Sequence, residues 1–231
     1  MHEVQEEKPN KIMLEQIGAT FGIGVVRYNL QELNNGLQEL GIGQFDNELV
    51  PLHFSIYTGF KGNFNVSFDI NWASSFGSKE MVDSHASMNL STFSFGPTVY
   101  YSVLTTNRFR LMALAGLRKN DMTFQYNANA MASPDFMDLL TNPATSGPVV
   151  ELKTARSAES ATFGSRLQYR LGRKENLKQR EYSVGIDLGY NHSFESVPWS
   201  EPLSRNAIRN MPAIKADHYY LHFTFSTLLL R

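Results

Sequence analysis

The chain contains no cysteine among its 231 residues. Disulfides, thiolate metal sites and cysteine nucleophiles are therefore excluded, and a cysteine-free chain suits an exported protein. There is no run of about 18 apolar residues, which excludes a transmembrane helix. Lys and Arg number 21 against 22 Asp and Glu, so the net charge of −1 provides no positive surplus to attract nucleic acid. No nucleic-acid partner is therefore expected.

The segment 63–72 alternates between apolar and polar residues without a break. One set is apolar and consists of Phe64, Val66, Phe68, Ile70 and Trp72. The other set is polar and consists of Asn65, Ser67, Asp69 and Asn71. Because successive side chains of a β-strand point to opposite faces, this pattern predicts a strand with one apolar and one polar face.

The same alternation occurs about eight times along the chain. The runs cover residues 17–25, 52–60, 63–72, 93–103, 109–118, 161–171, 182–191 and 219–226. Each is close to the length that a tilted strand needs to cross a bilayer. The alternation hides such strands from hydropathy scans, because only every second residue faces lipid.

The connections between these runs alternate between long and short. The long ones cover 28–48, 75–87, 128–159 and 195–216, and the short ones lie at 61–62, 104–107 and 172–181. Transmembrane barrels have short periplasmic turns and long outer loops. The sequence therefore predicts an all-β fold, an eight-stranded antiparallel up-and-down transmembrane β-barrel over 15–231. Residues 1–14 would form a periplasmic tail, and the even strand number would place both termini in the periplasm.

Alternation alone does not say which face points outward, and a soluble lipocalin-like barrel would enclose its apolar face around a ligand. The positions of the aromatic residues favour the membrane, because amphipathic rings collect at the two membrane interfaces. The expected aromatic girdle consists of Phe60, Phe64, Trp72, Tyr101, Phe109, Tyr169, Tyr182, Tyr190 and Tyr219. The opposite face is rich in small polar residues, which suit a crowded lumen.

With the polar face inside, charged side chains fall in the lumen. The expected ion-pair network consists of Asp69, Asp187, Arg110, Arg118, Arg166, Arg170, His53 and His222. A buried charge is costly unless it is paired, and eight strands enclose only enough space for side chains to fill. We therefore expect a polar, filled lumen closed by salt bridges. A polar path or ligand site through the lumen is the alternative.

Two local features carry further expectations. Pro97 lies inside the fourth run, and because proline cannot donate to a ladder we expect a bulge or bend at Gly96-Pro97. In the first long loop, Leu30, Leu33, Leu37 and Leu40 lie on one face of a short helix that Asn29 could cap, although Gly36 weakens it. Such a helix would pack on the barrel rim, bind a partner or lie on the membrane surface.

Possible catalytic side chains gather only at the ends of the last two strands. They are His192, Ser193, Glu195, Asp217 and His218. Neighbouring residues of a strand point to opposite faces, so these do not form an evident triad. The histidines show no metal-ligand spacing and no glycine motif for a phosphate is present. We predict no catalytic residues, no metal and no cofactor.

The beginning of the chain, residues 1–11, is polar and charged and has no apolar h-region. An outer-membrane protein requires a signal peptide for export. We therefore expect that the signal peptide is missing from this sequence, which would then be a mature or trimmed form.

The run Phe93-Ser94-Phe95-Gly96-Pro97-Thr98-Val99-Tyr100-Tyr101 and the closing strand 219–230 resemble small outer-membrane barrels of Bacteroidota. These carry the outer membrane protein β-barrel domain, described as PorT-family or OmpA/OmpX-like. Such barrels tend to end on an aromatic residue, whereas this chain ends Leu228-Leu229-Leu230-Arg231. The resemblance implies an integral outer-membrane protein without catalytic residues, in contact with lipopolysaccharide and phospholipid.

The expected function is structural or interactive. The barrel would be a membrane anchor displaying extracellular loops, with other outer-membrane or periplasmic proteins left open as partners in a larger complex. A narrow channel for small solutes is the alternative. An enzyme at the outer rim, acting on lipid A or on peptides, is a third hypothesis.

Overall fold

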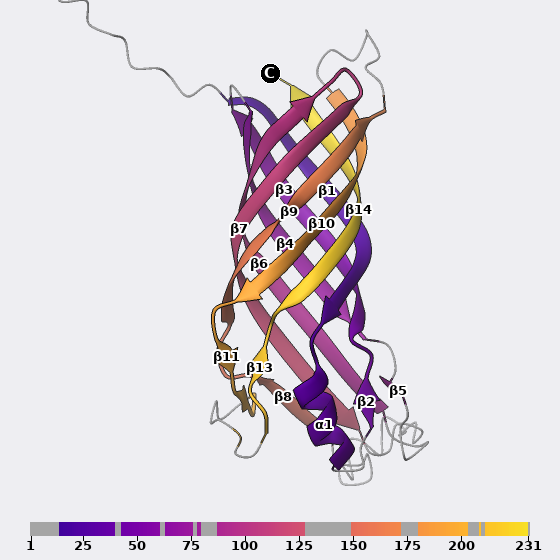
Figure 1. Ribbon diagram of the computed structural model, residues 1–231, viewed down its shortest axis with the longest axis vertical. Helices are drawn as coiled ribbons and strands as arrows, with labels where there is room; N and C mark the ends of the chain where they lie inside the picture. The colour runs from indigo at the N-terminus through magenta and orange to yellow at the C-terminus, as the bar shows by residue number, and fades with distance from the viewer. Residues whose placement is uncertain are drawn as a thin grey trace, which may run out of the picture.

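The computed structural model describes residues 14–39, 43–60, 63–75, 78–79, 87–127, 149–171, 180–202, 208 and 211–230. Eight long strands dominate it and run obliquely around a common axis (Figure 1). They are β1 (Leu14–Tyr28), β3 (Glu48–Phe60), β4 (Phe64–Ser74), β6 (Ser87–Thr105), β7 (Phe109–Asn127), β9 (Ala158–Arg170), β10 (Arg180–Ser193) and β14 (His218–Leu230). Each contains one of the eight runs predicted from the sequence, or all but one residue of it.

The eight strands close into a ring in which every pair is antiparallel. Their order is β7, β6, β4, β3, β1, β14, β10 and β9, and β9 pairs again with β7. The seam between β1 and β14 runs from Gln16 opposite Leu230 to Tyr28 opposite His218. The predicted fold class, an eight-stranded antiparallel barrel, is confirmed.

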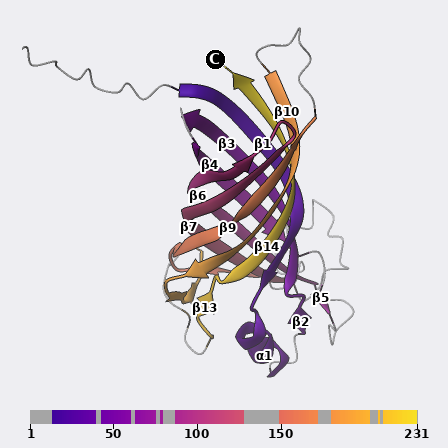
Figure 2. The same ribbon diagram turned by 45° about the horizontal axis from the view of Figure 1, so that its top comes forward.

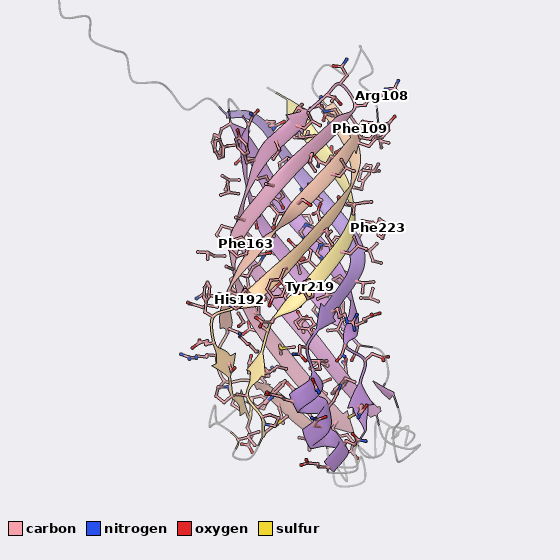
Figure 3. All side chains as sticks on the ribbon, viewed as in Figure 1. Arg108, Phe109, Phe163, His192, Tyr219 and Phe223 are labelled. Carbon is pink, nitrogen blue, oxygen red and sulfur yellow. The ribbon has the colours of Figure 1, made fainter. Side chains whose placement is uncertain are left out.

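The apolar set of side chains faces outward and the polar set faces inward. Phe68 is 49% exposed and Phe223 is 56% exposed, whereas Asp69 is 0% and Arg166 is 2% exposed. Figure 3 shows Phe223 and Phe163 pointing away from the barrel wall. This is the orientation predicted for a transmembrane barrel, and the lipocalin-like alternative is wrong.

The two ends of the barrel differ. The end that carries the turn between β6 and β7, at residues 106–108, is called the short-turn end, and both Leu14 and Leu230 lie there (Figure 1). The opposite end, called the long-loop end, carries the helix α1 (Gln31–Glu39) and several short strands. These strands are β2 (Gln44–Phe45), β5 (Ser78–Lys79), β8 (Val149–Thr154), β11 (Ser196–Val197), β12 (Trp199–Ser200) and β13 (Ile214–Lys215).

The strands β6 and β7 extend well beyond their predicted ends toward the long-loop end, to Ser87 and Asn127. Beyond the barrel, β7 pairs with β8 and β8 pairs with β12. The predicted runs 93–103 and 109–118 are therefore shorter than the strands β6 and β7 that contain them. The outer face of this extension is polar. On it, hydrogen bonds from Lys153 and Gln125 to the Glu151 carboxylate lower the pKa of Glu151.

At the long-loop end, the inward side chains of the extended strands are apolar and form a second core. This cap core includes Leu30, Leu33, Leu37, Leu49, Leu90, Met122, Phe124, Val197 and Trp199. Figure 2 shows α1, β2 and β13 gathered at this end of the barrel. The long-loop end is thus a folded cap rather than a set of independent loops.

The helix α1 lies in the segment where the sequence predicts one. Leu30, Leu33 and Leu37 are buried in the cap core, and the Asn29 side-chain oxygen accepts a hydrogen bond from the Gln31 amide at 3.3 Å. The predicted helix on the barrel rim is present, while Leu40 lies outside the described residues. Among the parts of the chain that the structure describes, no helix has the length and hydropathy to span a membrane.

The bulge expected at Gly96-Pro97 takes a different form. The register with β4 passes through both residues without a shift, since Asp69 lies opposite Gly96 and Phe68 opposite Pro97. On the other side, the pairing with β7 omits these two residues and resumes in the same register. The register shift in β6 lies instead between Ser102 and Leu104. The pairing of β6 with β7 is interrupted at Pro97, while the pairing of β6 with β4 continues through it.

Candidate functional site

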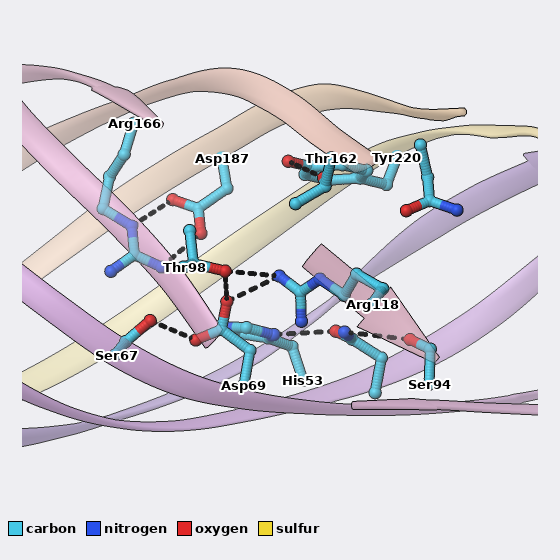
Figure 4. Close-up of polar contacts among 12 residues, drawn as sticks. His53, Ser67, Asp69, Ser94, Thr98, Arg118, Thr162, Arg166, Asp187 and Tyr220 are labelled. Carbon is cyan, nitrogen blue, oxygen red and sulfur yellow. Dashed lines mark hydrogen bonds and ion pairs between the residues drawn. The ribbon is translucent and has the colours of Figure 1, made fainter. Parts of the chain in front are cut away.

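The lumen contains a buried cluster around Asp69 at mid-barrel (Figure 4). One carboxylate oxygen accepts a hydrogen bond from Ser67 Oγ at 2.6 Å. The other accepts from Thr98 Oγ1 at 2.7 Å and from Arg118 Nη2 at 2.6 Å. Asp69 is completely buried, so its charge depends on these partners.

The ion pair between Asp69 and Arg118 crosses an intervening strand. Asp69 lies on β4 opposite Gly96 of β6, and the register on either side places Gly96 level with Arg118 of β7. A methyl group at Gly96 would collide with the Leu117 carbonyl oxygen. The missing side chain therefore leaves the space through which β7 approaches β6 and Arg118 reaches Asp69.

A second ion pair links neighbouring strands. Arg166 of β9 donates to Asp187 of β10 through Nε at 2.6 Å and Nη2 at 2.5 Å, as the direct register of the two residues allows. The guanidinium group lies over the Tyr100 ring, 4.5 Å from its centre. Two-point hydrogen bonding and a ring contact hold this arginine in one orientation.

Two of the predicted lumen residues, His53 and His222, stack on each other with ring centres 5.0 Å apart. His53 Nδ1 is 2.7 Å from the Asn71 side-chain oxygen, and the Tyr220 ring also stacks on His222 at 5.0 Å. Both Nε2 atoms are buried without a hydrogen-bond partner among the described residues. The histidines thus lie beside the ion pairs but take part in none that the described part of the chain contains.

Two predicted members of the network are placed elsewhere, which is a correction. Arg170 pairs with Glu181 at 3.1 Å near the short-turn end, and no ion pair within the described residues engages Arg110. The reason is height along the barrel, because Arg110 and Arg170 start or end their strands while Asp69 and Asp187 lie in the middle. The alternation of side chains along a strand predicts which residues face the lumen, but it does not predict their height along the barrel axis.

Little empty space remains beside the ion pairs of the described strands. A cavity of about 30 Å³, lined by His53, Asp69, Arg118 and Asp187 among others, lies beside the ion pairs. This volume has room for about two water molecules. The side chains therefore fill the lumen at this level.

The residues of the predicted aromatic girdle lie on the outer surface at both ends of the apolar band. Several form pairs across neighbouring strands: Phe64 with Tyr101 at 5.0 Å, Phe109 with Tyr169 at 5.1 Å, Tyr182 with Phe225 at 6.1 Å and Tyr190 with Tyr219 at 4.7 Å. Phe60 ends β3 near the short-turn end. Trp72 lies toward the other end of β4, opposite Leu52.

The possible catalytic residues at the long-loop end do not form a triad. His192 is exposed, with Nδ1 3.6 Å from Asp217 Oδ1. The neighbouring Ser193 is buried, and its hydroxyl donates to the Glu195 carbonyl oxygen at 3.0 Å. His218 is buried against the Ala216 carbonyl oxygen at 2.9 Å. Among the described residues there is also no group of three or more potential metal ligands.

The sequence contains a pattern that predicts the cap core, but a search for strands with outward apolar residues does not find it. Met88 and Leu90 on β6, and Met122 and Phe124 on β7, continue the alternation but place the apolar residue on the inward face. Trp199 is completely buried among them. The point where the apolar residues change from the outward to the inward face therefore marks where the strands leave the apolar band.

No family model matches the chain, and no curated protein matches it. Several solved structures are similar to it. A major outer membrane protein from Thermus thermophilus is 9% identical, with a TM-score of 0.52 over 93% of this chain and 98% of that one. Neisserial surface protein A is 9% identical, with a TM-score of 0.49 over 94% and 96%. Ail, the attachment invasion locus protein of Yersinia pestis, is 12% identical, with a TM-score of 0.45 over 94% and 99%.

The likeness to the Thermus protein concerns the fold alone, because the identity is low. Together with the apolar exterior and the polar, filled lumen, it leads to one structural conclusion. The chain has the fold of an eight-stranded transmembrane β-barrel of the outer-membrane type.

Proposed function

We propose that this protein is an integral outer-membrane protein that acts as a closed anchor and presents its folded cap for interaction. The observation that carries the proposal is the change of the barrel interior from paired charges to an apolar core. Ion pairs and stacked rings fill the lumen, and the cap core lies over it. A wall that faces lipid and an interior filled by side chains at the level of the ion pairs suit an anchor better than a conduit.

The surface of the cap contains a cleft that a partner could contact. Between α1 and β13 lies a cleft of about 220 Å³, lined by Glu32, Leu33, Pro212, Lys215 and Asp217 among others. Lys215 and Asp217 form an ion pair at 3.2 Å along one side of it. Protein interfaces combine apolar and polar side chains, and the lining of this cleft contains both kinds.

The narrower assignment to the Bacteroidota barrels, and the periplasmic location of the short-turn end, belong to this proposal. The first rests on the runs 93–101 and 219–230. The second rests on the general rule that outer-membrane barrels turn tightly in the periplasm and extend their connections outward. We also propose that the protein is not an enzyme, since Ser193 is buried while His192 is exposed.

The proposal is tested by placing a photo-reactive residue at Glu32, on the exposed side of α1, in the full chain expressed in its membrane. We expect a discrete cross-linked macromolecule. The matched control is the same residue at Thr105, which is exposed at the short-turn end, where that adduct should not form. Absence of any discrete adduct at Glu32 contradicts an interaction role.

A second measurement separates the anchor from a channel. Purified protein is reconstituted in a planar bilayer, and the filled lumen should give no defined unitary conductance. Substitution of Arg118 by Ala, which opens space beside Asp69, is the positive comparison. Regular conductance steps from the unmodified protein would contradict the closed anchor.

A further inference from the structure

A groove of about 540 Å³ lies on the outer, lipid-facing surface of the barrel near its short-turn half. Branched aliphatic side chains of β9 and β10 lie between aromatic side chains of the flanking strands. Leu167 and Ile186 are opposite each other in register, and Phe223 of β14 is opposite Ile186 on the other side. Phe109 of β7 closes the groove toward the short-turn end. The volume is in the range of sites that hold small organic ligands.

Cationic side chains lie where this groove reaches the short-turn end. Arg108 directly precedes Phe109, and Figure 3 shows both at this end with Phe223 lower on the same side. Arg180 is exposed and begins β10, two residues before Tyr182, whose ring stacks on Phe225 in the groove.

The backbone fixes the place of Arg108 at the end of β9, and no described residue forms an ion pair with Arg108 or Arg180. The Arg170 amide donates to the Arg108 carbonyl oxygen at 2.8 Å, which ties the turn to β9. Arg170 itself is paired with Glu181. Within the described ranges, no ion pair engages Arg108 or Arg180. Two exposed guanidinium groups are thus available at the edge of the apolar band.

We propose that the groove and these two arginines form a binding site for one anionic phospholipid, with an acyl chain along Leu167 and Ile186 and the phosphate at Arg108 and Arg180. Guanidinium groups bind phosphate oxygens in a two-pronged geometry, and basic side chains at a membrane surface attract anionic lipid. The inference rests on the proposed membrane location and adds a lipid class to it.

A second copy of the chain is a poorer occupant of the same surface. A two-fold contact places the same patch on both subunits. It would bring Arg108 and Arg180 of one copy toward those of the other, and like charges brought together at an interface are unfavourable. A phospholipid supplies both the apolar chain and the opposite charge.

The test uses the full chain, purified in detergent and titrated with phosphatidylglycerol or with phosphatidylcholine of the same acyl chains, with bound lipid counted by native mass spectrometry. We expect one phosphatidylglycerol to be retained preferentially. The double variant R108Q/R180Q should weaken this binding about thirtyfold and leave phosphatidylcholine unchanged. The control is Lys119→Gln, which removes an exposed cation toward the other end of β7 and should change neither lipid.

A second pair of variants examines the groove. Ile186→Trp fills it and should reduce retention of phosphatidylglycerol several-fold, whereas Ile56→Trp, on the exposed outer face of β3, should not. Equal binding of the two lipids, or no effect of R108Q/R180Q, would overturn the site and leave annular lipid only. A dimer in analytical ultracentrifugation that Ile186→Trp disrupts would overturn it in favour of a second copy.

Insertion into vesicles is measured in parallel for each variant by the shift of the folded band on unheated gels. Unmodified protein that fails to insert contradicts the proposed membrane location. Protein that inserts but shows no lipid preference contradicts only the phospholipid site. The two failures are therefore distinguishable.

Discussion

The lumen and the cap core are two interiors built from the same strands, and they have opposite chemistry. On β6 the inward residues are Met88 and Leu90 in the cap, and then Thr92 and Ser94 in the lumen. In the cap the inner face is apolar and the outer face polar, while in the lumen the inner face is largely polar and the outer face apolar. Some buried side chains of the lumen are apolar or aromatic, among them the group Tyr100, Met112 and Leu114, and Leu228 near the short-turn end.

The difference shows that the surroundings of a sheet decide what it encloses. Where the wall meets water, burying apolar side chains inside is favourable. Where the wall meets acyl chains, burial of apolar groups inside brings no such gain, and packing and hydrogen bonds hold the structure instead. The lumen therefore depends on ion pairs such as Arg118 with Asp69, and the cap depends on packing around Trp199.

The largest effect is expected in the lumen. Asp69→Ala leaves the buried Arg118 without its partner and should lower the free energy of unfolding by about 3–5 kcal/mol. The double variant D69L/R118M removes both charges and should be close to neutral. Urea unfolding in detergent, followed by the shift of the folded band on gels, provides the measurement. Equal losses in the single and double variants would show that charge pairing is not what stabilises the lumen.

In the cap, removal of an apolar side chain should act locally. Leu37→Ala creates a cavity beneath α1 and should destabilise the cap by about 2–3 kcal/mol. Hydrogen exchange should accelerate in 31–39 and stay unchanged in the barrel strands. Glu32→Ala, on the exposed side of the same helix, is the control. Faster exchange throughout the barrel would show that the two interiors are one cooperative unit.

Glycines in the two regions should respond in opposite directions to the same change. Gly96→Ala forces β6 away from the Leu117 carbonyl oxygen and should cost about 1–3 kcal/mol. Gly36→Ala lies in α1, where a methyl group meets only Pro212 at 3.7 Å, and should add up to about 1 kcal/mol of stability. Both are measured by the same urea titration. A stabilising Gly96→Ala would contradict the close approach described for the lumen.

The smallest effect is expected at the exposed ion pair between Arg156 and Glu195. Glu195→Gln should change the free energy of unfolding by about 0–1 kcal/mol, because both groups are largely hydrated. The value should shrink further in high salt. A loss as large as that of Asp69→Ala would remove the distinction between buried and exposed charges.

The sequence predicts the fold because alternation with a period of two is unambiguous over ten residues, as from Phe64 to Trp72. It also predicts that Arg166 and Asp187 share the lumen. It does not predict that Arg118 reaches Asp69, because that contact crosses Gly96 and depends on the register of three strands. Register is set by turns and tilt, which residue pattern does not encode directly.

The cap is harder to predict for a different reason. Within the membrane the apolar residues of a strand face outward, but the apolar residues Met122 and Phe124 face inward. A prediction that keeps apolar residues on one face throughout therefore ends β7 at Arg118. The packing of Trp199 depends on contacts between segments far apart in the chain. The helix α1 is predicted, because its leucines repeat within one segment.

The seam of the barrel has a consequence for how the protein is made. The hydroxyl groups of Thr20 and Ser226 are 2.8 Å apart although 206 residues separate them. Until β14 has been synthesised, β1 and the partly assembled sheet expose unsatisfied backbone groups, which invite pairing with other chains. Ring closure must therefore wait until β14 has been made, and the chain has to be kept from pairing with other chains until then.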